Sequence, residues 1–339
     1  MGRDFLRNDS KTKKRGSEEI ERRKAVLLIQ HAPHEHPAAL KRALETQGIQ
    51  SLWIHPFRGD SYPNPSTLRG VISLGGPMGA NDDLLHPWIP DECKLLREAA
   101  LEGLPTVGIC LGGQMLARAL GGSVEKNSIA EVGWFPMELN SHGREDPIIG
   151  AAGSRPLVYH WHHDTFFLPQ GAAPLASSEA CPRQAFRIGD KAYGFQFHPE
   201  ADHQLIHEWL NIEGVPEEIR QTQDQHGRTS VQDANTQKEM AREGERASLK
   251  ITAAISQLFK NHPYSPIDLH LNEQIETWTT EKTPILIEVE GSDRKPLLLK
   301  GHISSILTVP DGEFVIFRDE NTLLWPIRMD HIQRATPFT

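Results

Sequence analysis

Cysteine is scarce in this sequence. Only Cys93, Cys110 and Cys181 occur among 339 residues, and no two of them form a CxxC pair. A sparse set with an odd count favours a reducing compartment over a disulfide framework. Without CxxC pairs, thiolate-rich zinc sites are not expected either.

Long apolar runs and an excess of positive charge are also missing. No stretch approaches the roughly 20 apolar residues that span a bilayer, and the charged segment 1–24 lacks the apolar centre of a signal peptide. The formal net charge is -9, which argues against nucleic acid as the main partner, because phosphate binding usually shows as a basic excess. We therefore expect a cytoplasmic protein without membrane contact, preceded by a disordered or loosely helical leader over 1–24.

From residue 25 onwards, short apolar runs alternate with segments of helical spacing. Continuous apolar runs are typical of strands that are buried on both faces, and the alternation implies a parallel sheet with helices on both sides. The expected strands are 25–30, 51–54, 70–74 and 106–109, and the expected helices are 37–47, 88–102 and 114–120. Short strands and turns then follow until the chain returns to the sheet at 192–197, before a helix at 202–210.

The rest of the chain divides by composition. We assign 25–262 to one α/β domain, whose segment 215–260 is polar and helical, and we expect a linker over 263–283. Residues 284–339 contain five short strand candidates separated by turn residues, which suits a small β-barrel of the SH3 or Sm kind. The candidates are 285–289, 297–299, 302–306, 313–317 and 322–327.

The segment 108–114, GICLGGQ, places Cys110 between an expected buried strand and an expected helix. Small residues on both sides allow the sharp turn of a nucleophile elbow, which holds a side chain clear of the sheet. A helix N-terminus favours the thiolate form, and its exposed amides can stabilise an oxyanion. The alternative at this point is a buried structural cysteine in an ordinary turn.

A histidine and a carboxylate end the strand at 192–197. His198 and Glu200 are two residues apart, so in an extended segment both side chains point the same way. A cysteine nucleophile needs a base, and the imidazole needs an acceptor that orients it. The alternative is a surface pair beside a proline turn.

A glycine-rich loop, 75–79 (GGPMG), follows another expected strand. Glycines there allow backbone amides to approach a ligand closely. A phosphate-binding loop is the competing interpretation, but the lysine and Ser/Thr of the Walker motif are missing.

Taken together and in this order, the three segments resemble the class I glutamine amidotransferase family, which uses a Cys-His-Glu triad. Segments 108–114 and 197–200 match its two signatures, while 75–79, 131–134 and 160–166 fit its stand-alone, GMP-synthase-like members. The resemblance covers about 25–210. It implies a flavodoxin-like, doubly wound and mostly parallel sheet with the site at the carboxyl ends of the strands.

The resemblance also implies roles. Cys110 would attack the γ-carboxamide of glutamine or a γ-glutamyl compound, His198 would act as base and then acid, and Glu200 would orient it. The backbone amides of Gly76 and Leu111 would form the oxyanion hole. The implied substrate contacts are Gln114, Val132, Gly133, His163 and Asp164, of which His163 stands where many members have glycine.

The resemblance leaves three functions open. In the first, the protein releases ammonia for a separate synthetase subunit, since no ATP-pyrophosphatase loop is present in this chain. In the second, it cleaves γ-glutamyl amines or peptides. In the third, it serves as a regulatory module. In the last case the C-terminal piece, which resembles the Rof-like (Rho-inhibitor) mini-domain, would bind RNA or protein. Its expected positive charge comes from Lys300, His302, Arg318, Arg328 and Arg334.

Two histidine clusters raise the question of a metal. We expect no cofactor and no metal site, because the first cluster lies in a polar loop and the second lies inside a motif that requires no metal. The clusters are His31, His34 and His36, and His160, His162 and His163.

Overall fold

The computed structural model describes residues 25–224, 228–229, 234–260, 267, 269–290, 296–309 and 312–338. The predicted leader, 1–24, lies outside the described residues. No helix in the described part of the chain is long and apolar enough to cross a bilayer.

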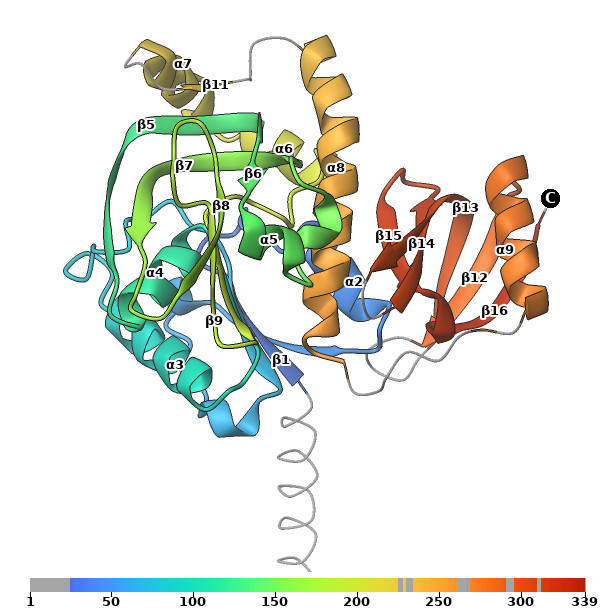
Figure 1. The fold of residues 1–339 in the computed structure, drawn as a ribbon, viewed down its shortest axis with the longest axis horizontal. Helices are drawn as coiled ribbons and strands as arrows, with labels where there is room; N and C mark the ends of the chain where they lie inside the picture. The colour runs from blue at the N-terminus through green and yellow to red at the C-terminus, as the bar shows by residue number, and fades with distance from the viewer. Residues whose placement is uncertain are drawn as a thin grey trace, which may run out of the picture.

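An eight-stranded sheet forms the centre of the larger unit (Figure 1). Its order is β2 (Gln50–Ile54), β1 (Ala25–Ile29), β3 (Gly70–Ser73), β4 (Thr106–Ile109), β10 (Ala192–Phe195), β9 (Ala185–Ile188), β8 (Ala173–Ser177) and β6 (Glu138–Leu139). The first five strands pair in parallel, and the last three are antiparallel. The succession β2-β1-β3-β4 is that of the flavodoxin-like fold, as predicted.

Helices cover both faces of this sheet. Alternate residues of β1 point to opposite sides, with Val26 and Leu28 in one apolar cluster and Leu27 and Ile29 in another. The first cluster includes side chains of α2 (Ala38–Glu45) and α8 (Ala234–Gln257), and the second those of α3 (Ile89–Leu101) and α4 (Leu111–Ala119). The sheet is therefore buried on both faces, as its continuous apolar strands require.

A second, three-stranded sheet lies beside the carboxyl ends of the parallel strands (Figure 1). Its order is β11 (Arg228–Thr229), β5 (Ser123–Pro136) and β7 (Leu157–Phe167). The helices α5 (Ser141–Glu145), α6 (His203–Leu210) and α7 (Val215–Asp224) complete this unit. α8 passes so close to β5 that a Cβ at Gly244 would lie 2.1 Å from the Trp134 ring, which requires glycine there.

The C-terminal unit is a five-stranded antiparallel sheet with a helix packed on it. Its order is β15 (Leu324–Arg328), β14 (Gly312–Asp319), β13 (Pro296–Val309), β12 (Ile285–Glu290) and β16 (Ile332–Pro337). The two strands expected at 297–299 and 302–306 form the single strand β13, and β16 is an additional strand. The stretch predicted as a linker, 263–283, contains α9 (Leu269–Glu281), whose Ile275 and Trp278 are buried in the core of this sheet.

The two units pack together through α2 and α8. Leu249 and Ala253 of α8 share an apolar cluster with Phe314, Ile316 and Leu324 of the C-terminal sheet. Two polar contacts reinforce this packing, since Arg42 Nε donates to the Leu324 carbonyl at 2.6 Å and Thr46 Oγ1 to the Pro326 carbonyl at 2.6 Å.

One residue of the expected basic surface lies in this interface instead. Arg328 is 1% exposed, forms an ion pair with Asp330 and donates to Gln257 Oε1 at 3.2 Å. The expectation that Arg328 is a free surface charge is therefore wrong. The sequence shows the charge but does not show that α8 covers it.

Candidate active site

Cys110 lies in a sharp turn where β4 ends and α4 begins. Its backbone angles, φ 51° and ψ -107°, fall where residues with a side chain are strained. A Cβ at Gly108 would lie 2.3 Å from the Gly112 carbonyl oxygen, and one at Gly112 would lie 2.2 Å from the Ser73 carbonyl oxygen. The glycines on both sides are thus required by close packing, and the turn presents the Cys110 side chain at the edge of the sheet.

His198 follows β10 and lies beside this turn. Its Nδ1 is 2.8 Å from Glu200 Oε1, and the Cys110 sulfur, which lies 3.6 Å from the Trp161 carbonyl oxygen, is close enough to affect the charge of the imidazole. Burial alone would lower the pKa of His198, but the Glu200 carboxylate and Cys110 together raise it well above the ordinary value. The imidazolium form is therefore favoured beside the sulfur, with Glu200 fixing the ring through its other nitrogen.

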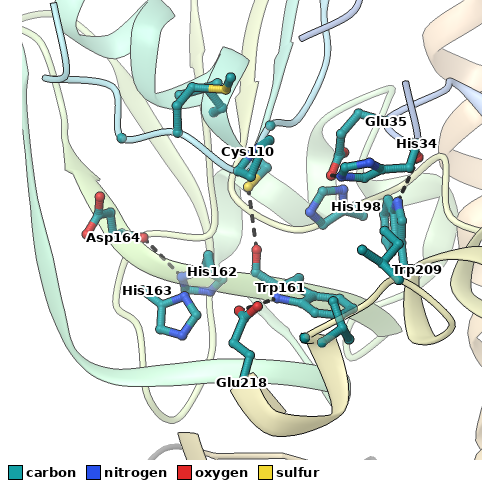
Figure 2. Close-up of a pocket in the computed structure, with 18 of the residues that line it drawn as sticks. His34, Glu35, Cys110, Trp161, His162, His163, Asp164, His198, Trp209 and Glu218 are labelled. Carbon is teal, nitrogen blue, oxygen red and sulfur yellow. Dashed lines mark hydrogen bonds and ion pairs between the residues drawn. The ribbon is translucent and has the colours of Figure 1, made fainter. Parts of the chain in front are cut away.

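A cavity of about 530 Å³ opens in front of Cys110 and His198 (Figure 2). Its volume lies in the range of sites for small molecules. The structure brings most of the predicted site residues to this cavity, while Glu200 lies behind His198. The predicted residues that line it are Gly76, Cys110, Leu111, Gln114, His163, Asp164 and His198.

Two backbone amides flank the cavity beside Cys110. Within the described part of the chain, the amides of Gly76 and Leu111 have no backbone hydrogen-bond acceptor, whereas the Gly112 amide donates to the Leu74 carbonyl at 3.1 Å. A Cβ at Gly76 would lie 2.7 Å from a Leu111 methyl carbon, so the two segments are in close contact. Both residues also line the cavity beside Cys110.

The predicted substrate contacts divide into two groups. Gln114 is buried and its amide nitrogen is 3.4 Å from the Asp164 carbonyl oxygen, while burial raises the pKa of the Asp164 carboxyl. Val132 and Gly133 do not line the cavity, because they lie in β5, one strand behind Trp161 of β7.

Three further residues at the cavity are not predicted from the sequence. Trp161 and Trp209 form an aromatic wall, with ring centroids 5.9 Å apart, and the Trp209 indole donates to the His34 carbonyl at 2.8 Å (Figure 2). Glu35 comes from the same loop as His34. In the sequence it stands among the histidines of a polar loop, and no spacing there indicates a place beside the base.

Glu35 lies against the reacting groups. A Cβ at Gly75 would be 2.7 Å from Glu35 Oε2 and 3.0 Å from His198 Cε1, so both side chains contact the same glycine. Burial and repulsion from Glu200 raise the pKa of Glu35 to about 7, although His198 opposes this shift. Glu35 can therefore change its charge near neutral pH beside the base.

One cluster near the cavity has the composition of a metal site. Ligand atoms of Glu131, His160 and His162 lie within 4.8 Å of one another, and all three side chains are buried. Burial lowers the pKa of His160 to about 3, so its ring is neutral, as a metal ligand must be. Glu131 also accepts hydrogen bonds from Ser178 at 2.7 Å and Gln184 at 2.8 Å, so its carboxylate joins β5 to the segment between β8 and β9.

Comparison with known proteins agrees with this geometry. The profile of the family described as "Glutamine amidotransferase class-I" matches residues 38–213, more than half of the chain. The glutamine amidotransferase-like protein YfeJ of Salmonella typhimurium is 32% identical over 179 residues, which cover 52% of this chain and 75% of YfeJ. A GMP synthase (glutamine-hydrolysing) of Porphyromonas gingivalis is 34% identical over 158 residues, covering 44% of this chain but only 29% of that enzyme.

Solved structures show the same fold. A glutamine amidotransferase of Methylobacillus flagellatus superimposes with a TM-score of 0.64 at 28% identity, covering 72% of this chain and 99% of that one. One from Thermotoga maritima gives 0.61 at 26% identity, covering 70% and 98%. These likenesses confirm the flavodoxin-like sheet and the predicted enzyme class. The chain belongs to the class I glutamine amidotransferase family.

Proposed function

We propose that this protein hydrolyses the side-chain amide of glutamine through a γ-glutamyl thioester on Cys110. The observation that carries this proposal is the strained Cys110 turn, with the His198–Glu200 pair at its side, facing a cavity of about 530 Å³. Family membership supports the same chemistry. His198 is the base that the sulfur requires, and Glu200 is its orienting acceptor.

The geometry suggests the order of steps. The Cys110 sulfur attacks the amide carbon, and the carbonyl oxygen becomes an oxyanion that accepts hydrogen bonds from the Gly76 and Leu111 amides. The His198 imidazolium gives its proton to the amide nitrogen, the C–N bond breaks, and ammonia leaves. Water then loses a proton to His198 and attacks the thioester, which releases glutamate and restores the thiol.

Glutamine would lie between the Cys110 turn and the end of β7. The side chains of Gln114, His163 and Asp164 line that part of the cavity and would contact the amino-acid portion of the substrate. Val132 and Gly133 lie in the strand behind, so they would act only by supporting Trp161 and its neighbours in β7.

Cleavage of γ-glutamyl amines or peptides is the second candidate, and the shape of the cavity favours it. Trp161, Trp209 and Glu35 line the space beside His198, where the leaving amine would lie. An aromatic wall and a carboxyl there suit a leaving group larger than ammonia, because rings pack against apolar chains and a carboxylate binds amines.

We further propose that the released ammonia is passed to a synthetase on a separate chain.

For the C-terminal sheet, we propose a small SH3- or Sm-like barrel that binds RNA or protein. Positive charge near this sheet supports the binding of a polyanion. Arg318 of β14 lines a cavity of about 730 Å³ together with Arg242, Arg246 and Lys250 of α8. Of the five residues expected to make the C-terminal piece basic, Arg318 lines this cavity at the junction of the two units.

The test of the main proposal is an assay of glutamate release by the purified full-length protein, from glutamine and from γ-glutamyl peptides in parallel. We expect release from glutamine, with its loss in Cys110→Ser. Faster release from the peptides would favour the second candidate. Undiminished release by Cys110→Ser would overturn both.

A further inference from the structure

A second buried histidine–carboxylate pair lies behind the glycine loop, and the proposed mechanism does not use it. His31, which follows β1, and Glu92 of α3 are both 0% exposed. His31 Nδ1 is 2.9 Å from the Gly75 carbonyl oxygen, and its Nε2 is 3.0 Å from both carboxylate oxygens of Glu92. Trp88 stacks on the imidazole, with ring centroids 5.2 Å apart, so the ring has a fixed plane.

The hydrogen bonds around this pair define its charge. Ser73 Oγ donates to Glu92 Oε1 at 2.6 Å and Tyr62 Oη donates to Glu92 Oε2 at 2.9 Å, so Glu92 is an acceptor throughout and is a carboxylate. Both ring nitrogens of His31 therefore face acceptors, which requires a proton on each. Burial would lower the pKa of His31, but Glu92 outweighs it and the pKa is raised, in agreement with an imidazolium.

The contact with Gly75 bears directly on the oxyanion hole. The Gly75 carbonyl and the Gly76 amide belong to one peptide unit, which is planar and trans, so the N–H points away from the C=O. With the oxygen fixed toward His31, the Gly76 N–H is directed to the opposite side, where Gly76 lines the cavity. A cation on the oxygen also polarises the amide and strengthens its N–H as a donor.

We propose that His31 and Glu92 are positioning residues, which hold and polarise the Gly75–Gly76 peptide so that its N–H stabilises the oxyanion. His31 supplies the charged donor, and Glu92 keeps it charged and oriented. This inference rests on the proposed function, since it assigns a device to the amide hydrolysis on Cys110.

The experiment compares variants of the full-length protein with the better of the two substrates, glutamine or a γ-glutamyl peptide. Removing a whole oxyanion donor typically lowers kcat about 10²–10³-fold; here the donor remains but loses its support, so we expect a loss of roughly 10–100-fold in His31→Leu. Glu92→Gln should lose roughly tenfold, with KM nearly unchanged. His31→Gln, which keeps one N–H donor toward Gly75, should recover part of the loss of His31→Leu.

Tyr62→Phe is the matched control, because it removes a bond to Glu92 without touching His31 or Gly75. We expect it to keep kcat within about twofold of the wild type, since one neutral hydrogen bond contributes little net energy. The second readout is alkylation of Cys110 by iodoacetamide, a displacement that forms no oxyanion. The alkylation rate should stay at the wild-type value in all variants, whereas a distorted Cys110 turn would change it.

The outcomes separate this inference from the proposed function. Wild-type kcat in a folded His31→Leu or Glu92→Gln, or an equal loss of alkylation and turnover, would overturn the positioning role alone. If His31→Leu does not fold, the comparison of Glu92→Gln with His31→Gln and Tyr62→Phe decides. A wild-type protein that cleaves neither substrate would overturn the proposed function, and the positioning role with it.

Discussion

The Cys110 cavity and the core of the C-terminal sheet show how differently two buried regions of one chain can be built. Around the cavity, the buried side chains include charged or chargeable pairs, His198 with Glu200 and His31 with Glu92. In the C-terminal sheet, the core consists of apolar side chains such as Phe317, whose burial stabilises the sheet.

The difference indicates where the chain accepts an energetic cost. Buried charges are expensive unless they are paired, and a positive φ at Cys110 adds strain of roughly 1–3 kcal/mol. Around Cys110 these features surround the nucleophile that we propose, which fits a catalytic role. The C-terminal sheet contributes packing, and its buried Arg328 pairs with Asp330 only two residues away. Variants in both regions test this contrast, from the largest expected effect to the smallest.

The largest effect is expected from His198→Asn. Loss of the general base and acid should lower kcat by roughly 10²–10⁴-fold, because the thiol then has no proton acceptor and the leaving nitrogen no donor. Steady-state glutamate release measures this. His203→Asn is the matched control, since His203 pairs with Glu245 away from the cavity, and an equal loss in both variants would contradict a specific role for His198.

Phe317→Ala tests whether the C-terminal core contributes to stability without contributing to activity. Removing a fully buried aromatic ring from the C-terminal core should destabilise that unit by roughly 3–5 kcal/mol. Cys110 lies in the other unit, so we expect kcat to stay near the wild-type value at low temperature. Thermal denaturation and the activity assay, run on the same sample, check both halves; a strong loss of kcat in the folded variant would mean that the units are coupled.

Glu200→Gln should change the pH profile as well as the rate. Glu200 raises the pKa of His198, and the protonated ring, which donates to the leaving nitrogen, is lost as pH rises through that pKa. Without the carboxylate the pKa falls, so the alkaline decline of kcat should begin at lower pH, with roughly a tenfold lower maximum. The free energy of unfolding depends on pH in the same direction. A histidine whose pKa is raised by folding adds stability at a pH below its pKa in the unfolded chain, and this stability is lost as the pH rises through the pKa in the folded protein.

Local patterns in the sequence predict only part of this site. The glycines beside Cys110 and the order His198-Pro199-Glu200 are such patterns, so the turn and the pair are predictable from the sequence alone. Glu35 and the two tryptophans of the aromatic wall meet only through the fold, and no spacing in the sequence links them. The same holds for His31 and Glu92, which are 61 residues apart.

The elements that the sequence misplaces have a similar cause. α9 contains few apolar residues besides Ile275 and Trp278, so its helical face is defined mainly by the sheet on which it packs. In β13, Lys300 and Gly301 interrupt the apolar pattern and divide one long strand into two apparent runs, although both residues pair with the neighbouring strands. Long-range pairing decides such cases, and periodicity does not report it.

The smallest effect is expected from Glu35→Gln. Its carboxyl titrates at about pH 7, being neutral below and charged above, so the variant resembles the low-pH form of the wild type. We expect kcat/KM to change by about two- to fivefold and the inflection near pH 7 to disappear. A pH series of kcat/KM measures this, and an unaltered inflection in the variant would assign that titration to another group.

The central claim is tested most directly by trapping the covalent intermediate. Full-length protein is mixed with glutamine, quenched in acid, digested and examined by mass spectrometry. We predict one γ-glutamyl group on the peptide that contains Cys110, and none in Cys110→Ser. A γ-glutamyl adduct on another residue, or turnover of glutamine by Cys110→Ser at the wild-type rate, would contradict it.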